Sequence, residues 1–140
     1  MKDEAIKRMI QEHEGYRDEV YLDSVGKPTC GWGHLLAKGS KVPEEAARAF
    51  FQEDYRAAKA DYLSLVRHYN LDLEPVRRAV LIDMLFNMGF SRVRGFRRML
   101  AALAVDDYEL AADEMLDSKW AIQVGKRAIE LSRMMREGEV

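Results

Sequence analysis

The chain has 140 residues, of which 48% are hydrophobic and 33% charged, and its formal net charge is −2. This length and this balance of residue types predict one globular domain, residues 1–140, and exclude a disordered or fibrous chain. No apolar run is long enough to cross a bilayer, which excludes stable membrane insertion. Residues 1–15 are charged and amphipathic and lack the apolar centre of a secretion signal, so we expect synthesis in the cytoplasm.

The first predicted element is a helix that ends at Glu14. Apolar residues recur at helical spacing before it, at Ile6, Met9 and Ile10. Gly15 is a natural end for this helix, because glycine accepts the backbone conformations that close helices. Glu14 would then lie at the negative end of the helix dipole, where an ionised carboxylate is disfavoured. We therefore expect Glu14 to retain a proton more readily than an ordinary surface acid.

The next segment, Tyr16 to Gly33, is predicted to form short strands and glycine-containing turns. It carries a second carboxylate, Asp23, and a hydroxyl, Thr29. A carboxyl that keeps its proton, together with one that stays ionised, is what acid-catalysed glycoside cleavage requires. The spacing alone is weak evidence, because the chain has 24 Asp and Glu residues and most such pairs are solvated surface charges.

The remainder of the chain is predicted to be helical. Pro43 and the acids after it begin a long amphipathic helix over residues 43–66. Asp54 falls on the apolar stripe of this helix, where a buried carboxylate would need a cationic or hydrogen-bond-donating partner. A buried helix is expected from Glu74 to Met88, closed by Gly89.

Two more helices are predicted towards the end of the chain. Asp106 and Glu109 have the spacing of a capping box, which would open a helix that runs through Leu116. Ala128, Leu131 and Met135 mark the apolar side of a final helix.

A run of arginines without an acid precedes these last helices, at Arg92, Arg94, Arg97 and Arg98. We interpret it as a solvated turn; the alternatives are a local contact with an anionic polymer or a nucleic-acid-binding site. Nucleic-acid binding is the weakest of these, because a slightly acidic chain lacks an extended basic face.

The cysteine and histidine content argues against metal or disulfide chemistry. Cys30 is the only cysteine, so no intrachain disulfide is expected, and it is best interpreted as a small packed residue of a strand. A nucleophilic thiol with His34 as its base is the alternative. His13, His34 and His68 do not match a metal-ligand spacing, and we expect neither a metal nor another cofactor.

The order of several motifs resembles the phage-type lysozymes, the endolysin family. The matching positions are Glu14-Gly15, Tyr21-x-Asp23, Gly26, Thr29-x-Gly31-x-Gly33-His34, Phe51-x-x-Asp54, Arg77-Arg78, Phe86-Asn87-Met88-Gly89, Gly95-Phe96, Ser118-Lys119-Trp120 and Arg127-Ala128. They extend over essentially the whole chain.

The resemblance implies an α+β, lysozyme-like fold. An N-terminal lobe with a β-hairpin would occupy about residues 13–42, a linking helix about 43–66, and a helical lobe 67–140 together with the first helix. A cleft between the lobes would accept a polymeric substrate. The segment 35–42 is shorter than the corresponding insertion in the family's type member, which trims one lip of that cleft.

The resemblance also implies a muramidase that hydrolyses the β-1,4 bond between N-acetylmuramic acid and N-acetylglucosamine in bacterial peptidoglycan, with inversion. Glu14 would be the general acid, and Asp23 with Thr29 would hold the attacking water. His34 and Asp54 would form a pair that supports the site, and Arg127 would lie near Glu14.

Binding and context are implied in the same way. Phe86 and Asn87 match cleft-lining residues of the family, although from the residues alone Phe86 is equally a core residue and Asn87 equally a helix cap. The family further implies a monomer that lyses the host after a separate, holin-type protein permeabilises the membrane. The alternative is a lysozyme-fold protein that binds wall glycan without cleaving it, or that serves as a structural component of a larger assembly.

Overall fold

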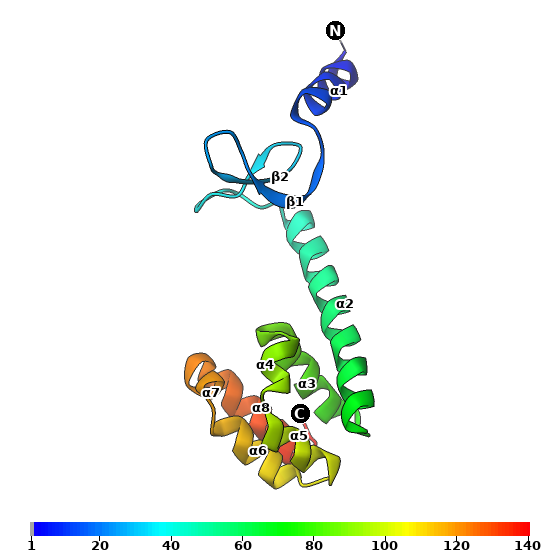
Figure 1. Ribbon diagram of the computed structural model, residues 1–140, viewed down its shortest axis with the longest axis vertical. Helices are drawn as coiled ribbons and strands as arrows, with labels where there is room; N and C mark the ends of the chain where they lie inside the picture. The colour runs from blue at the N-terminus through cyan, green and yellow to red at the C-terminus, as the bar shows by residue number, and fades with distance from the viewer. Residues whose placement is uncertain (1) are drawn as a thin grey trace. The chain divides into compact units, whose positions relative to one another are not determined.

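The computed structural model describes residues 2–140, which form two compact units, one ending at Ala46 and the other running from Ala47 to Val140. A small antiparallel sheet among many helices gives the α+β class that the sequence predicts (Figure 1). The elements are α1 (Asp3–Glu14), β1 (Arg17–Leu22), β2 (Pro28–Gly31), β3 (His34–Leu35), α2 (Glu44–Tyr69), α3 (Pro75–Met88), α4 (Phe90–Arg94), α5 (Arg97–Ala104), α6 (Tyr108–Leu116), α7 (Lys119–Val124) and α8 (Lys126–Glu137).

The first unit consists of α1, the sheet and the start of α2. Helix α1 ends at Glu14 as predicted, and the Gly15 N–H donates to the Gln11 carbonyl at 2.9 Å, with φ of Gly15 at 70°. The strand order is β1-β2-β3, so β2 is central and pairs with both neighbours. Thr29 lies opposite Tyr21 of β1 in the register of the sheet, and it is the one buried residue among those described in this unit.

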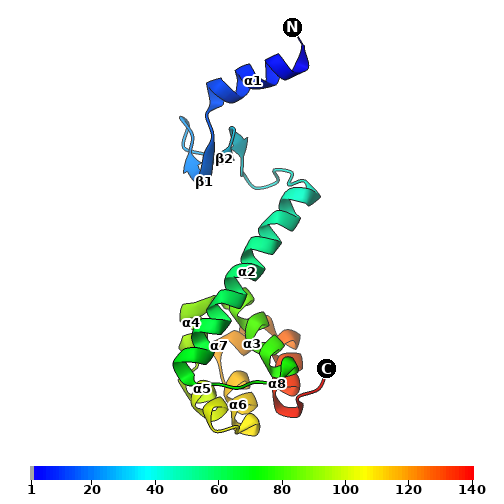
Figure 2. The same cartoon turned by 90° about the vertical axis from the view of Figure 1, so that its right-hand side faces the viewer.

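The second unit contains the hydrophobic core. Helices α3 to α8 gather around one another with the C-terminal part of α2 (Figure 2). The largest fully buried side chains of this core are Leu65, Leu81, Met84, Met99, Leu100, Leu103, Met115, Met135, Val80 and Val93. None of the helices in residues 2–140 has both the length and the apolarity needed to pass through a bilayer.

Helix α2 is longer than the predicted helix over residues 43–66, and it is buried along only part of its length. It begins at Glu44, directly after Pro43, and continues to Tyr69, beyond the predicted end at residue 66. Its apolar stripe is buried only in the C-terminal half. Phe51 and Asp54, in the N-terminal half, are exposed, so burial does not oblige Asp54 to have a partner.

The helix starts show which predicted caps are right. The buried helix predicted from Glu74 to Met88 is confirmed: α3 begins at Pro75, with Glu74 as its N-cap residue. The Glu74 carboxylate accepts from the Arg77 N–H at 3.4 Å. The predicted capping box at Asp106 is wrong. Asp107 caps α6 by accepting from the Leu110 N–H at 3.1 Å, whereas Asp106 has φ of 57° and accepts from the Tyr108 hydroxyl.

Three short helices, α4, α5 and α7, were not predicted. The arginine run therefore does not form a turn: Arg92 and Arg94 lie on α4, and Arg97 and Arg98 begin α5. All four side chains are exposed, as the sequence analysis expected of solvated residues.

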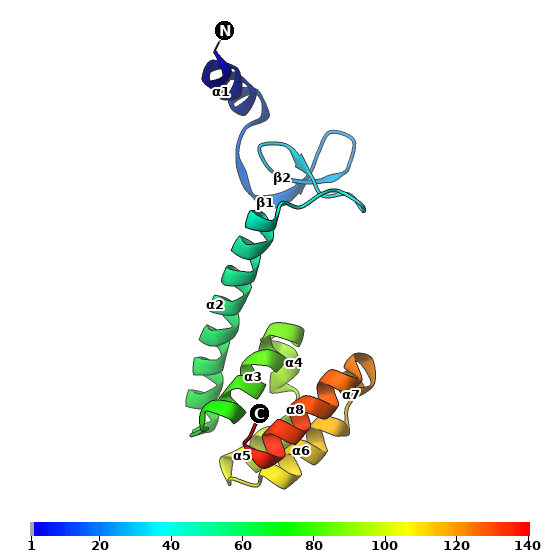
Figure 3. The ribbon, with the colours of Figure 1, turned by 180° about the vertical axis from the view of Figure 1, so that it is seen from behind.

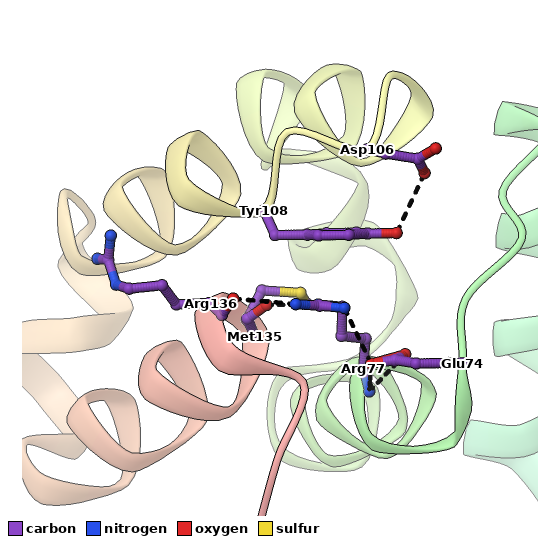
Figure 4. A network of polar contacts seen from close by, with 6 residues as sticks. All are labelled: Glu74, Arg77, Asp106, Tyr108, Met135 and Arg136. Carbon is purple, nitrogen blue, oxygen red and sulfur yellow. Dashed lines mark hydrogen bonds and ion pairs between the residues drawn. The ribbon is translucent and has the colours of Figure 1, made fainter.

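Helix α8 is held by its neighbours at its C-terminal end. It lies beside α6 (Figure 3), where Arg136 forms ion pairs with Glu109 and Asp113. On the other side, the largely buried Arg77 of α3 donates from Nε to the Met135 carbonyl at 2.6 Å and from Nη2 to the Arg136 carbonyl at 2.9 Å (Figure 4). Carbonyls that a helix end leaves without partners are thus satisfied by one guanidinium.

Candidate active site

Glu14 lies at the last position of α1, and its side chain rests against the glycine-rich end of the sheet. A methyl group built on the Gly33 Cα would lie 2.6 Å from the Glu14 Oε2 atom and 2.9 Å from its Cδ. The carboxyl group therefore occupies the space that a side chain at residue 33 would take. Glu14 is exposed, which leaves the carboxyl accessible to a substrate.

Asp23 and Thr29 are brought together through the main chain of Lys27. The Asp23 Oδ1 atom accepts from the Val25 and Lys27 N–H groups, both at 2.9 Å. The Lys27 carbonyl in turn accepts from the Asp23 N–H and from the Thr29 Oγ1, again at 2.9 Å in both cases. Both side chains are therefore fixed by the same turn, and the two hydrogen bonds to the Asp23 carboxylate are both accepted by Oδ1.

His34 begins β3 and lies opposite Cys30 in the sheet; its side chain is exposed. Asp54 belongs to the second unit and is also exposed. The pairing of His34 with Asp54 joins the two units and remains a prediction. Cys30 is a free, half-buried cysteine, and its packing role stays a prediction.

Arg127 pairs with Asp83, a residue that the sequence analysis missed. The Arg127 Nε donates to Asp83 Oδ1 at 2.8 Å, and Nη2 lies 2.7 Å from the same oxygen. Both side chains are about 40% exposed, at 41% and 39%. The sequence does offer a signal for Asp83: it lies between apolar residues of α3, where a charged side chain needs a partner. Proximity of Arg127 to Glu14 remains a prediction.

The ion pair forms part of the wall of an open pocket within the second unit. This pocket has a volume of about 370 Å³, and its lining includes Asp83, Arg127 and the aromatic rings of Phe51, Tyr55 and Phe86. The Phe51 and Phe86 ring centroids are 5.4 Å apart. Phe86 is therefore neither a fully buried core residue nor an isolated surface ring: it belongs to an accessible aromatic cluster.

Asn87 faces a different neighbour from Phe86. The Asn87 Oδ1 atom accepts from Trp120 Nε1 at 2.7 Å, and Trp120 is buried. This bond fixes the rotation of the amide, so that its NH₂ group points away from Trp120. Asn87 is not the cap of α3, since the Gly89 N–H donates to the Leu85 carbonyl at the helix end.

A larger open pocket of about 670 Å³ lies in the same unit and was not predicted. Its lining carries charges of both signs, from Arg92, Arg97, Arg98, Glu114, Asp117 and Lys119, beside Phe96 and Trp120. Three members of the arginine run thus line a concave surface. Across residues 2–140, no three His, Cys, Asp or Glu side chains are grouped so that they could hold a metal ion.

Comparison with known proteins gives full-length and partial relatives. Probable T4-type lysozyme 2 of Dictyostelium discoideum is 27% identical, and the alignment covers 96% of this chain and 95% of that protein. The endolysin of Salmonella phage P22 is 32% identical over 80% of this chain and 78% of its own length. The pre-baseplate central spike protein Gp5 of Enterobacteria phage T4 is 29% identical over 97% of this chain, which spans 28% of that protein.

The family profile described as Phage lysozyme matches residues 11–137. The matched region includes Glu14, Asp23 and Thr29, and it extends through Arg127. With nearly the whole chain matched, the protein belongs to the phage lysozyme family.

Proposed function

We propose that this protein is a muramidase that hydrolyses the β-1,4 bond between N-acetylmuramic acid and N-acetylglucosamine in bacterial peptidoglycan, and that it acts in host-cell lysis. Family membership and the endolysin relative support the broader function of a peptidoglycan hydrolase. The observation that carries the narrower proposal is the first unit, where an accessible carboxyl ends α1 and a second one is fixed by the turn at Lys27.

Glu14 is the general acid in this mechanism. It donates its proton to the glycosidic oxygen as the bond to the leaving sugar breaks, so the leaving group departs as a neutral alcohol. Its place at the last position of α1, with an exposed side chain, leaves the carboxyl free to reach a glycosidic oxygen.

Asp23 is the general base. Two main-chain N–H groups hold its Oδ1, and the other oxygen accepts a proton from the water that attacks the anomeric carbon on the face opposite the leaving group. This single displacement inverts the configuration, and it needs the two carboxyl groups about 6.5–9.5 Å apart.

Thr29 positions Asp23 and limits how the water can be oriented. Its hydroxyl proton is donated to the Lys27 carbonyl, so Oγ1 acts towards a water only as an acceptor. A water held in this way directs its other hydrogen to Asp23. Thr29 is 3% exposed, so its side chain is almost entirely shielded from bulk solvent.

Substrate contacts are proposed at Asn87 and Phe86. The Asn87 NH₂ group, oriented by Trp120, suits the carbonyl of an N-acetyl group, and the Phe86 ring offers an apolar surface to a sugar face. His34, Asp54 and Arg127 support the site in this proposal without touching the reacting atoms.

Product analysis tests which bond is cleaved and how. Digestion of purified peptidoglycan, followed by borohydride reduction and mass spectrometry, should give new reducing ends on muramic acid. Proton NMR of the first products should show the α-anomer. Reducing ends on glucosamine would contradict the assigned bond, and β-anomeric first products would contradict inversion.

The matched pair Asp23→Asn and Asp18→Asn tests the base. Asp18 is an exposed acid on β1 in the same unit. We expect Asp23→Asn to lower the rate at least about 100-fold, as is usual when a general base is removed, and Asp18→Asn to leave it near the parent value. Equal activities would exclude Asp23 as the base.

A structural role is the alternative function, and the match to a central spike protein is the observation that favours it. In that case the purified protein would bind peptidoglycan without releasing soluble fragments. For the cellular context we propose a monomer whose action depends on a membrane-permeabilising protein. Expression alone should then leave cells intact until chloroform permeabilises the membrane.

A further inference from the structure

We propose that Gly33 is a positioning residue: because its Cα carries no side chain, it leaves the space in which the Glu14 carboxyl is held for catalysis. This inference rests on the proposed role of Glu14 as general acid. The three heavy atoms nearest to a methyl group built on Gly33 all belong to the Glu14 side chain: Oε2 at 2.6 Å, Cδ at 2.9 Å and Cγ at 3.5 Å. The first two distances are shorter than real carbon contacts, so a side chain at residue 33 and the present position of Glu14 are incompatible.

The steric clash of a side chain at Gly33 is with the catalytic group and not with the backbone. The atoms that would clash are the far end of a flexible, exposed glutamate, which can rotate away without disturbing the backbone. A displaced Glu14 would keep the protein folded but would move the proton donor away from the glycosidic oxygen. A misplacement of about 1 Å costs on the order of 100-fold in rate.

Gly33 also has φ of 78°, so any L-residue there carries backbone strain that must be separated from the contact with Glu14. The chain provides a matched control two residues earlier. Gly31 has φ of 62°, and a methyl group built on it meets no heavy atom within 4 Å among the described residues. Gly31→Ala therefore reports strain alone, and Gly33→Ala reports strain together with the displacement of Glu14.

Kinetics of the two variants provide the test. We expect similar urea midpoints for both variants, while Gly33→Ala loses about 100-fold more kcat than Gly31→Ala, with little change in KM, because the acid acts in the transition state. The pH–rate profile should change shape in Gly33→Ala and not in Gly31→Ala, since only the first variant changes the surroundings of Glu14. Equal kinetic losses in the two variants would overturn the proposal.

A measurement on the parent protein keeps the inference testable if Gly33→Ala does not fold. NMR should show nuclear Overhauser contacts between the Glu14 γ-protons and the Gly33 α-protons. Their absence would contradict the proposed contact between the Glu14 side chain and Gly33. Glu14→Gln separates this inference from the proposed function. If Glu14→Gln is inactive and Gly33→Ala is as active as Gly31→Ala, only the positioning role of Gly33 is wrong. If Glu14→Gln is fully active, the role of Glu14 as general acid is wrong.

Discussion

At the scale of single residues, the sequence predicts the side chains of the candidate site better than the contacts that hold them. Asp23 and Thr29 stand out by residue type and by resemblance to the family. The main chain of Lys27, which binds both, has no signal in the sequence because any residue could supply those atoms. Asp83 was missed for another reason: its partner Arg127 lies 44 positions away in the chain.

The hydroxyl of Thr29 is predicted to matter more than its methyl group. Thr29→Val keeps the shape but removes the donor to the Lys27 carbonyl, which should cost about 1–2 kcal/mol of stability and about 10-fold or more in activity. Thr29→Ser retains the donor and should remain close to the parent in activity. Urea denaturation and peptidoglycan clearing measure the two effects; a Val variant as active as the Ser variant would contradict the role of the hydroxyl.

Tyr62 is predicted to make stability depend on pH in the alkaline range. Burial raises the pKa of Tyr62 above its ordinary value of 10.0, against the opposing charge of Arg78. The folded state therefore favours the neutral phenol: the stabilisation is complete below pH 10, the value in the unfolded chain, and is lost as the pH rises through the folded pKa. Urea midpoints should fall above pH 10, and less steeply in Tyr62→Phe. Parallel slopes for the two proteins would contradict this origin.

At the scale of elements, the long periodic segments were predicted well and the short ones were not. Helices α1, α3 and α8 have clear apolar spacing or terminal signals. Helices α4 and α7 have only five and six residues, too few to display a helical period. The cap of α6 was assigned one residue early, because Asp106 and Asp107 are both good capping residues and only the backbone angles decide between them.

The end of α8 is predicted to depend on Arg77. Its guanidinium binds the carbonyls of Met135 and Arg136 and stacks 3.5 Å from the Tyr108 ring centroid. Arg77→Met should lower the free energy of unfolding by about 2–3 kcal/mol, because charged hydrogen bonds to partly buried carbonyls are lost. The control is Arg133→Met, which removes an exposed pair with Glu137 and should cost less than about 0.5 kcal/mol. Equal costs in urea denaturation would contradict the role of Arg77.

At the scale of the whole molecule, the sequence indicates the fold class and family, but not where the stabilising core lies. Its apolar residues are spread along the chain, and Ile6, Met9 and Ile10 look like core positions on α1. In the structure all three are exposed, and the cluster of buried apolar residues belongs to the second unit. The assignment of the first helix to the helical lobe remains a prediction.

This distribution predicts unequal stability along the intact chain. Amides of α3, around Leu81 and Met84, should be protected from hydrogen exchange at least about 100-fold more than those of β1 and β2, since local stability follows buried apolar contacts. Native-state exchange followed by NMR measures the difference. Equal protection in the two units would show that the chain unfolds only as a whole.

Glu14 is proposed to supply the proton for glycoside cleavage, and a comparison of two variants that each remove one carboxylate from α1 tests this role. Purified Glu14→Gln and Glu12→Gln proteins, both checked for folding by circular dichroism, are added to isolated peptidoglycan beside the parent. Glu12 is an exposed acid of the same helix, two positions earlier. We predict that the parent and Glu12→Gln clear the suspension, while Glu14→Gln loses at least about 100-fold in rate. Clearing by Glu14→Gln at the parent rate would contradict the role of Glu14 as general acid.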